Sequence, residues 1–592
     1  MAVYIETEKI YKAYLNGARY VINGRKELNR INVFPVADGD TGNNLASAMK
    51  AILEDSSPGN SVKTTLESIA DACLRGARGN SGIIFAQYLN GVSEEIEHED
   101  HVTIENFTNA HLKSVEYAYN AVHKPVEGTM LTVMKDWASS MFDFRSNAKD
   151  FADLLSHSYK KLEESLKKTK NQLSALRKAG VVDSGAKGFA LFVQGIMDFL
   201  KNEKEMAIQD FMSGDFEGVS SDSHSNPEFR YCVEVLLNGG KEKTERIESE
   251  LEILGNSLVV AGNKRMTRVH IHTDKPASVF EIAEQHGEII EKKVDDMKKQ
   301  EELVSNKKYS IGLVTDSIAD LPQKIIDDYQ IHVVNLSIMM GEKEYYDKLT
   351  IENETLIRYY RESEDFPTSS QPEPKAVERA LGNIKDKYDS IIVITVASAL
   401  SGTYSVFKQE AEKLKNEGIV ISVIDSKQNS GAEGLLVHRA AHMISKGHKH
   451  EEIVSRIKIL TGKSRIMVSV RNLETMIRGG RLGTASGKIA EKLNFKPIVT
   501  LDESGNGTIG GIAFSNEGTA KKMLKHFQKQ HKAGKISEYC IVHVQAENEA
   551  KEFVKKLQEI AGFKPLYIME ASSVIAISAG EGAVALGYIG KE

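Results

Sequence analysis

Residues 1–203 carry a helical pattern of hydrophobic positions. In "AHLKSVEYAYNAVH" (110–123) and "FADLLSHSYKKLEESLKKTKNQLSALRKAG" (151–180), apolar residues recur three and four positions apart, and the second stretch ends at a glycine. This spacing places apolar side chains on one face of an α-helix. Runs that alternate like strands are scarce here, so the pattern predicts an all-helical N-terminal region.

The period of the hydrophobic pattern changes after residue 227. "YCVEVLLN" (231–238), "SLVVAG" (257–262) and "RVHIHT" (268–273) alternate like strands, and "SVFEIAEQHG" (278–287) has helical spacing. Residues 228–296 are therefore predicted to form a small α+β unit. From 309 to 592, strand runs such as "SIIVITVAS" alternate with helical stretches, which is typical of an α/β sheet covered by helices.

Two stretches between these regions look like linkers. Residues 204–227 are rich in Ser, Asp and Gly without a sustained period, and residues 297–308 belong to a run of charge that could equally be a helical connector. The predicted domains are therefore 1–203, 228–296 and 309–592. A chain of 592 residues is too long for a single core, which agrees with several domains.

Composition narrows the class of protein. The chain is 41% hydrophobic and 27% charged with a net charge of -7, so it has no basic field that would favour nucleic acid. Its three cysteines are too widely spaced for a disulfide framework, which favours a reducing cytoplasm. The N-terminus has no signal-peptide pattern, and no window approaches eighteen consecutive apolar residues, so we expect neither a signal peptide nor a transmembrane segment.

An aspartate pair stands out in "NVFPVADGDTGNNL" (32–45). Asp38 and Asp40 lie one residue apart, next to Gly39 and Gly42, and the amides of Asn43 and Asn44 follow. The segment could be a turn whose aspartate caps the next helix, but one aspartate would suffice for that. Two carboxylates with nearby amide oxygens suit a hard cation such as magnesium. Both interpretations stay open on these residues alone.

Three further polar segments stand at expected helix starts in residues 1–203. Free backbone N–H groups and the helix dipole favour a phosphate at such a position, although a lone Gly/Ser turn more often caps a helix. Several polar helix starts beside an aspartate pair predict one common binding site for a nucleotide with its bound metal ion. The residues are Gly79, Asn80, Ser81, Gly82, Gly128, Thr129, Asp183, Ser184 and Gly185.

The middle region offers a second candidate metal site. His270 and His272 are two residues apart on an expected strand, so both imidazoles point to one face. With the thiolate of Cys232 they would make a three-ligand zinc site. The alternative is a polar strand face beside a small buried cysteine, and from the spacing alone that alternative is favoured.

Hydroxyl side chains gather where strands should end in residues 309–592. Serines there usually cap the next helix. As a set they are more informative, because pockets in open α/β sheets lie outside the carboxyl ends of the strands, where donors from several loops can converge on one anion. The set is Thr315, Ser317, Ser369, Ser370, Ser401 and Thr403.

Four phrases, "INVFPVADGDTGNNL", "GARGNSGIIFAQ", "EGTML" and "DSGAKG", resemble the nucleotide-binding domain of the dihydroxyacetone kinase L-subunit family, in the variant of bacterial fatty acid kinase. The resemblance implies an antiparallel all-α helical barrel in which Asp38 and Asp40 hold magnesium ions that bridge the phosphates of ATP. Asn32 stands near the place of a third aspartate in sugar-kinase members and is a weaker, neutral third ligand. The helix starts would contact the nucleotide, through Asn43, Asn44, Gly79, Asn80, Ser81, Gly82, Gly128, Thr129, Asp183 and Gly185.

The other two regions carry resemblances as well. "LGNSLVVAG", "VHIHTDKP" and Cys232 resemble the middle domain of fatty acid kinase, which implies zinc at Cys232, His270 and His272. "PTSSQPEP", "ASALSGTYS" and "RGGRLG" are similar to the DegV family of fatty acid binding proteins. That similarity implies a fatty acid carboxylate held at the mouth of an apolar tunnel. The residues expected to bind it are Ser369, Ser370, Ser401, Gly402 and Arg481.

One departure from the DegV pattern concerns the last motif. The family commonly has "HxGPG" there, whereas this chain reads "ISAGEGAVALG", with Ser578 and Glu581 in place of the histidine and the proline. An imidazole beside the acyl carboxylate is therefore missing. The departure leaves open how the ligand's head group is bound and which head group it is, and the DegV resemblance stands.

Together the resemblances imply a cytoplasmic ATP-dependent fatty acid kinase, with kinase and acyl carrier in one chain, that makes acyl phosphate and ADP. Two alternatives stay open: a dihydroxyacetone-like small-molecule kinase, for which no reactive histidine motif is evident, and a non-catalytic lipid-binding protein. The expected cofactors are ATP and Mg²⁺, with Zn²⁺ in the middle domain. Expected partners are a fatty acid, a downstream acyltransferase and a membrane surface in transient contact, with no nucleic acid; a homodimer is left open.

Overall fold

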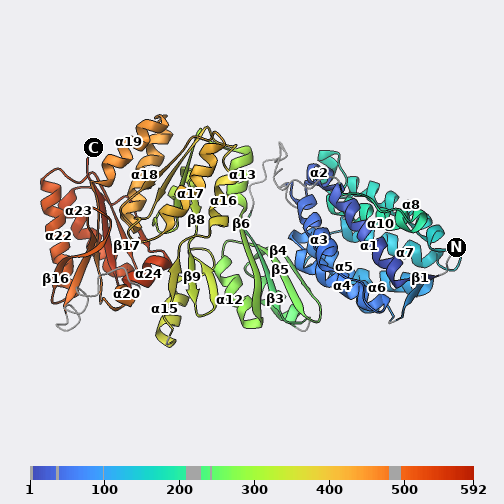
Figure 1. The fold of residues 1–592 in the computed structure, drawn as a ribbon. Coiled ribbons are helices and arrows are strands. Elements are labelled where there is room, and N and C mark those ends of the chain that lie inside the picture. The colour runs from blue at the N-terminus through green and yellow to red at the C-terminus, as the bar shows by residue number, and fades with distance from the viewer. Residues whose placement is uncertain are drawn as a thin grey trace. The chain divides into compact units, whose positions relative to one another are not determined.

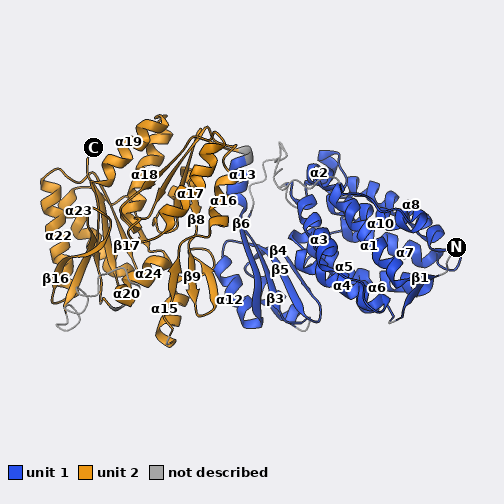
Figure 2. Cartoon of the chain, viewed as in Figure 1, with its two compact units in different colours: residues 1–305 blue, residues 306–592 orange. Residues whose placement is uncertain are grey.

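A computed structural model describes residues 4–34, 39–97, 99–208, 228–240, 243–363, 365–471, 473–478 and 495–591. It divides into two compact units, residues 1–305 and residues 306–592 (Figure 2). Within the described residues, no helix is both long and apolar enough to cross a bilayer.

The first part of unit 1 is helical, as predicted, apart from the short paired strands β1 (Tyr4–Glu6) and β2 (His101–Thr103) (Figure 1). Each long helix packs against its neighbours in the chain, and α10 packs along α1. The helices are α1 (Thr7–Asn23), α2 (Arg25–Arg30), α3 (Thr41–Asp55), α4 (Val62–Gly76), α5 (Gly79–Glu95), α6 (Ile104–Asn120), α7 (Met130–Phe144), α8 (Phe151–Gln172), α9 (Ser174–Ala179) and α10 (Ser184–Asn202).

Aromatic side chains fill the interior of this helical part. Phe85, Trp137 and Phe189 are fully buried, and the ring of Phe189 contacts each of the other two edge to face. His111 lies among them, 3.1 Å from the hydroxyl of Tyr14, and burial lowers its pKa to about 3. This histidine is therefore neutral and structural, and the packed interior places any binding site at the ends of the helices.

The predicted helical stretch 151–180 forms two helices instead of one. Leu173 has extended backbone angles between α8 and α9. The break lies against the loop before α7, because a Cβ at Gly128 would come within 2.6 Å of Gln172 Cβ. Gly128 has a φ of +86°, so the close approach and the left-handed backbone both require glycine here.

The second part of unit 1 is the predicted α+β region. Its antiparallel sheet has the order β4-β5-β3-β6, and hydrophobic side chains on one face pack under α11 and α12. Side chains on the other face, Leu236 among them, join the core of the helical part. The charged run from residue 292 begins as strand and continues as helix α13. The elements are β3 (Tyr231–Asn238), α11 (Thr244–Leu251), β4 (Gly255–Gly262), β5 (Met266–Thr273), α12 (Pro276–His286), β6 (Glu288–Asp296) and α13 (Met297–Ser305).

Unit 2 is an α/β region, as predicted, but its strands form three sheets instead of one. A parallel sheet has the order β13-β12-β7-β8, a small antiparallel sheet the order β10-β9-β11, and a mixed sheet the order β16-β15-β14-β19-β17-β18. Helix α18 contacts both the parallel and the mixed sheet, and its buried side chains join one core with strands of each (Figure 1).

The strands of unit 2 are β7 (Ile311–Asp316), β8 (His332–Val334), β9 (Ser337–Met340), β10 (Lys343–Tyr346), β11 (Thr368–Ser370), β12 (Ser390–Thr395), β13 (Ile421–Asp425), β14 (Ser464–Ser469), β15 (Lys496–Leu501), β16 (Gly507–Ala513), β17 (Glu538–His543), β18 (Ile568–Glu570) and β19 (Val584–Ile589). Its helices are α14 (Gln323–Asp328), α15 (Asn353–Glu362), α16 (Pro374–Gly382), α17 (Thr403–Asn416), α18 (Ser430–Ser445), α19 (His450–Thr461), α20 (Glu474–Arg478), α22 (Asn516–Lys532), α23 (Glu547–Ala561) and α24 (Ser573–Ala579).

A buried carboxylate joins the two halves of unit 2. Asp347, at the end of β10, accepts the backbone N–H of Ser573 at 2.8 Å and that of Val574 at 3.4 Å. It therefore caps α24 from a distant part of the chain. Burial raises the pKa of Asp347 from 3.8 to about 6.

This raised pKa predicts a dependence of stability on pH. Because folded Asp347 holds its proton more tightly than the unfolded chain does, its contribution is fully present in acid and is lost as the pH rises through 6. We expect a loss on the order of 3 kcal/mol between about pH 4 and pH 8. Hydrogen exchange of the Ser573 and Val574 amides should report it, and Asp347→Asn should flatten the dependence. An identical pH dependence in the wild-type chain and the variant would contradict the assignment.

Candidate functional site

The starts of four helices in the helical part of unit 1 meet at one place. A Cβ at Gly185, in the first turn of α10, would lie 3.2 Å from Ser81 Oγ of α5 and 3.5 Å from Met130 Cβ of α7. A Cβ at Gly79, the first residue of α5, would lie 2.5 Å from Asn44 Nδ2 of α3. The structure therefore brings together the four polar segments that the sequence singled out.

Asp40 stands at the start of α3. It is the N-cap residue, and its Oδ2 accepts the side-chain N–H of Asn44 at 2.8 Å. Asn43, the residue before Asn44, donates its backbone N–H to Asn29 Oδ1 at 3.1 Å. Asn32 is buried just beyond α2. Asp38 lies outside the described residues, so its predicted pairing with Asp40 stays a prediction.

The first turn of α5 has the features of an anion site. Gly79 has a φ of +55° and no room for a Cβ, so only glycine fits. Asn80 Oδ1 is buried and has no hydrogen-bond partner among the described residues. The N-cap, Arg78, makes no side-chain cap. An unsatisfied buried oxygen beside free helix N–H groups fits a polar ligand such as a metal nucleotide.

The N-cap residues of the other two helices, α7 and α10, differ in their side-chain contacts. Thr129 is the N-cap of α7, and its hydroxyl donates to the carbonyl of Val126 at 2.8 Å. Asp183 is the N-cap of α10 and accepts the N–H of Ala186 at 2.8 Å. Burial raises the pKa of Asp183 to about 6. Asp183 therefore has the capping role that was the plain alternative, whereas the Thr129 hydroxyl makes no cap bond to α7. The predicted contact of both residues with a nucleotide stays a prediction.

The predicted trio of metal ligands comes together on the sheet of the middle region. Cys232 lies directly opposite His272 in the pairing of β3 with β5, and the ligand atoms of Cys232, His270 and His272 all lie within 4.8 Å of one another. The Cys232 sulfur is 3.7 Å from His270 Nδ1. Three sulfur and nitrogen donors at this spacing suit a zinc ion with one open position.

Two pKa shifts bear on this trio. Burial lowers the pKa of His272 to about 3, so its imidazole is neutral, as a metal ligand must be. Burial also raises the pKa of the Cys232 thiol, and the carboxylates of Glu234, Asp295 and Asp40 add to the rise. A thiolate at Cys232 therefore requires a cation.

Sequence reasoning missed the contact between the middle region and α5. Glu234 Oε1 accepts the N–H of Gly79 at 2.6 Å, and Glu234 Oε2 lies 3.4 Å from an Arg78 nitrogen. Arg268, fully buried, lies 3.5 Å from the same oxygen and pairs with Glu291 at 2.9 Å. The available signal was the alternation of "YCVEV", which puts Glu234 on the face of Cys232, but nothing local shows what that face contacts.

In unit 2, two of the predicted hydroxyl loops meet. Gly402 precedes α17, and a Cβ there would lie 1.7 Å from Gln371 Oε1, in the loop after β11. Ser401 Oγ is 2.8 Å from Thr403 Oγ1. Strand β11, which carries Ser369 and Ser370, thus ends beside the loop of Ser401.

Two other members of the hydroxyl set are internal. Thr315 and Ser317 are fully buried, and Ser317 Oγ accepts the N–H of Leu336 at 3.1 Å. Ser317 therefore supports backbone pairing, whereas Thr315 Oγ1 is buried without a hydrogen-bond partner among the described residues.

The last motif lies close to these loops, because α24 contacts β11. Ser578, in α24, is half-buried, and its carbonyl accepts the hydroxyl of Thr475 at 2.7 Å. Glu581, at the place of the family proline, forms an ion pair with Arg361. Arg481 lies outside the described residues, and its predicted role stays a prediction.

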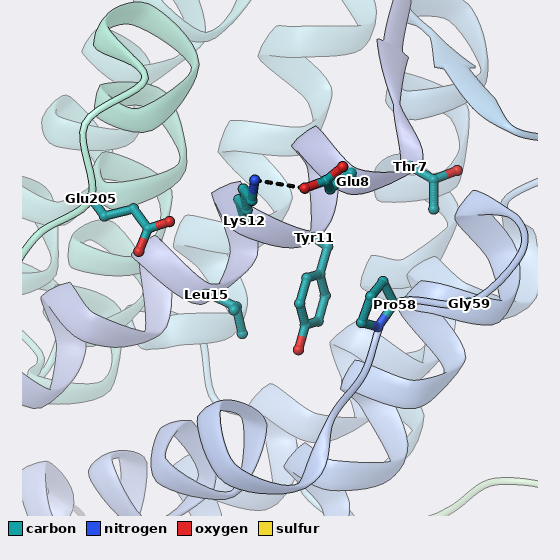
Figure 3. Close-up of a pocket in the computed structure, with 8 residues that line it drawn as sticks. All are labelled: Thr7, Glu8, Tyr11, Lys12, Leu15, Pro58, Gly59 and Glu205. Atoms are coloured by element: carbon teal, nitrogen blue, oxygen red, sulfur yellow. Dashed lines mark ion pairs between the residues drawn. The ribbon is translucent and has the colours of Figure 1, made fainter.

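A surface pocket of about 400 Å³ lies elsewhere, at the start of α1 (Figure 3). Tyr11 and Leu15 line it, and Glu8 and Lys12 pair at its rim with a distance of 2.7 Å. It contains none of the residues predicted for the nucleotide, metal or acyl sites. The remaining lining residues are Thr7, Pro58, Gly59 and Glu205.

Family models match three consecutive parts of the chain. The model of the DAK2 domain matches residues 35–198, and that of the FakA-like middle domain of fatty acid kinase matches residues 228–304. The model described as an uncharacterised protein of the DegV family matches residues 310–591. The chain joins a DAK2 domain, a FakA-like middle domain and a DegV domain. The helix starts and Asp40 belong to the DAK2 domain, the metal trio to the middle domain and the hydroxyl loops to the DegV domain.

Curated relatives match part of the chain. An uncharacterised protein of Staphylococcus epidermidis is 33% identical over 305 residues, and one of Staphylococcus aureus is 34% identical over 305 residues. Each match covers 50% of this chain. The chain spans about half the length of these relatives, 55% and 56% respectively.

Solved structures similar to the chain include DegV proteins described as fatty acid binding. One from Thermus thermophilus has 26% sequence identity, a TM-score of 0.45 and a match that covers 48% of this chain and all of that one. One from Bacillus subtilis has 24% identity and a TM-score of 0.44 with the same coverage.

Proposed function

We propose that this chain is an ATP-dependent fatty acid kinase that carries its own acyl-binding domain. The observation that carries the proposal is the meeting of four polar helix starts beside Asp40, in a chain whose middle domain matches the FakA-like model of fatty acid kinase. The DAK2 and DegV matches on either side support the pairing of a nucleotide domain with an acyl carrier.

The nucleotide would bind across the four helix starts. Asp40, with Asp38 and Asn32, would hold magnesium. The backbone N–H groups of Asn80 and Ser81 would donate hydrogen bonds to phosphate oxygens. Bound magnesium supplies charge neutralisation between the phosphates and the incoming carboxylate. The buried Asn80 Oδ1 supports a ligand at this place, because an amide oxygen without a partner calls for a cation or for a hydrogen-bond donor. Neighbouring loops at Asn43, Asn44, Gly82, Gly128, Thr129, Asp183 and Gly185 would shape the pocket.

The acyl group would be held in the DegV domain. The hydroxyls of Ser369 and Ser401 would donate to the fatty acid carboxylate, with Ser370, Gly402 and Arg481 nearby. Burying one methylene group is worth about 0.8 kcal/mol, so a long chain gains roughly 10 kcal/mol on leaving water. A dedicated domain can supply that burial and present the carboxylate, and a tether raises the local concentration of carrier, on the order of millimolar.

Phosphoryl transfer to a fatty acid would need no general base. A carboxylate oxygen attacks the γ-phosphorus of ATP, the bond from that phosphorus to the bridging oxygen breaks, and ADP leaves with the electron pair. The fatty carboxylate is already ionised near neutral pH, so no proton has to be removed. Positioning and charge neutralisation then account for most of the catalysis.

Zinc in the middle domain gives a separate prediction. We expect about one zinc ion per purified chain, and we expect Cys232→Ser and His272→Ala to lose most of it, because each variant removes one of only three protein ligands. Elemental analysis of the full chain would measure this. His286→Gln is the matched control, since His286 lies in the same domain but pairs with Glu250. Equal zinc content in all variants would contradict the site.

Two other functions are tested together with this one. A dihydroxyacetone-like kinase would share the nucleotide site, and the replacement of the family histidine by Ser578 keeps a non-catalytic lipid-binding protein open as the second alternative. Contact with a membrane surface, delivery to an acyltransferase of phospholipid synthesis and a homodimer stay predictions.

The deciding experiment measures ATP consumption by the full chain. We expect magnesium-dependent turnover stimulated by oleate or palmitate, with an acyl hydroxamate formed when hydroxylamine is added, and no stimulation by dihydroxyacetone. Stimulation by dihydroxyacetone alone would favour the small-molecule kinase. Lipid binding without ATP consumption would favour the non-catalytic protein.

A further inference from the structure

Helix α5 is capped by a residue from another domain. Its own N-cap, Arg78, makes no side-chain hydrogen bond to the first turn, and Gly79 has no side chain. The acceptor for the Gly79 N–H is instead Glu234 Oε1, at 2.6 Å, from strand β3 of the middle domain. Capping from 155 residues away makes the geometry of this turn depend on the docking of two domains.

The charge of Glu234 is balanced where it lies. Its side chain is almost fully buried, between the guanidinium groups of Arg78 and Arg268 at 3.4 and 3.5 Å. A second carboxylate, Glu291, pairs with the same two arginines. The two arginines offset the two glutamates, and His270 Nδ1 lies 3.6 Å from Glu234 Oε1. Glu234 therefore holds the turn without placing an uncompensated negative charge where phosphates would bind.

The contact continues from Glu234 to the proposed magnesium ligand. The Gly79 position that accepts no Cβ packs against the amide of Asn44, and that amide donates to Asp40 Oδ2 at 2.8 Å. One hydrogen bond from the middle domain thus holds Gly79 in place. The backbone of Gly79 in turn restricts the positions open to the Asn44 side chain. The N–H groups of Asn80 and Ser81 stay available for phosphate.

We propose that Glu234 is a positioning residue of the nucleotide site, supplied by the middle domain. The inference rests on the proposed function only in assuming that a nucleotide binds at α5. Glycine in a left-handed conformation is the most mobile residue a helix start can have, so an outside cap reduces the freedom that nucleotide binding would otherwise have to remove. The alternative makes the opposite prediction. If the Glu234 carboxylate competed with phosphate at the start of α5, its removal would tighten nucleotide binding.

The test compares Glu234→Ala with Glu291→Ala in the full chain. Both glutamates pair with Arg78 and Arg268, but only Glu234 accepts the Gly79 N–H. Calorimetric titration with a non-hydrolysable ATP analogue and magnesium should show roughly tenfold weaker binding for Glu234→Ala. We expect Glu291→Ala and Glu234→Gln to stay within about threefold of the wild-type chain, because the glutamine amide oxygen still accepts the N–H. Hydrogen exchange at residues 79–81 should be faster in Glu234→Ala alone.

Each outcome decides the inference. Tighter or unchanged binding in Glu234→Ala, or an equal loss in Glu291→Ala, would overturn it. A chain that binds the analogue but never consumes ATP with a fatty acid would refute the proposed function, and the binding series would still decide the role of Glu234. Hydrogen exchange tests the cap without any nucleotide, so unchanged exchange in Glu234→Ala would overturn the inference by itself.

Discussion

Replacing Asp40 by alanine should lower magnesium-dependent ATP turnover by roughly 100-fold or more. Asp40 stands at the start of α3, and its carboxylate already orients Asn44, which packs against Gly79 of α5. The variant would remove one of two expected anionic magnesium ligands and loosen the contact between two helix starts. A metal that bridges phosphates contributes several kcal/mol to transition-state stabilisation, and each 1.4 kcal/mol is about tenfold in rate.

The control for this variant lies on the same helix. Asp55→Ala changes an exposed carboxylate at the other end of α3 and should leave turnover within about twofold of the wild-type rate. Lipid recovered from Asp40→Ala should equal that from the wild-type chain, because the acyl loops belong to a separate unit. Full activity in Asp40→Ala, or a loss of bound lipid, would refute the assignment of Asp40. Asp38→Ala should behave like Asp40→Ala.

The second large effect concerns the acyl carboxylate. The double variant Ser369→Ala/Ser401→Ala should weaken fatty acid binding by roughly 100-fold or more, because a hydrogen bond to a charged group is worth about 1.5–3 kcal/mol. Strand β11, which carries Ser369, ends beside the loop of Ser401, since a Cβ at Gly402 would meet the side-chain oxygen of Gln371 in the loop after β11. With an imidazole absent at Ser578, these hydroxyls would carry more of the binding.

Mass spectrometry of lipid released from the purified chain and titration with palmitate would measure this effect. Ser398→Ala is the matched control, because Ser398 lies in the same loop before α17 but its hydroxyl donates to Asp425 at 2.6 Å. Nucleotide binding should be unchanged in both variants. Retention of lipid at wild-type levels in the double variant would contradict the assignment, and the head group would then have to be bound by another part of the DegV domain.

Local features of this protein follow from the sequence with little help. Helix α10 begins at Ser184, directly after Asp183, because that side chain accepts an N–H within the same turn. Strand β3 covers the predicted "YCVEVLLN" from its first residue to its last, since alternation of side chains is a property of neighbours. The break at Leu173 was not predicted, because it depends on packing against Gly128.

The metal trio shows an intermediate case. The spacing of His270 and His272 on one strand puts both on one face, but the position of Cys232 opposite His272 depends on the register between β3 and β5. Register is set by contacts between strands that are 38 residues apart, so spacing alone favoured the plain alternative. Folding placed the three ligand atoms within 4.8 Å of one another.

The amino-acid sequence by itself determined the helical, α+β and α/β regions, the polar starts of the helices and the side of each strand that bears chemistry. Tertiary structure alone decided that four helix starts meet, that α18 lies between two sheets and that Glu234 caps α5. The physical reason is range: helical periodicity, strand alternation and a cap from the N-cap residue itself act between residues a few positions apart, whereas these contacts join residues whose separation along the chain carries no local signal.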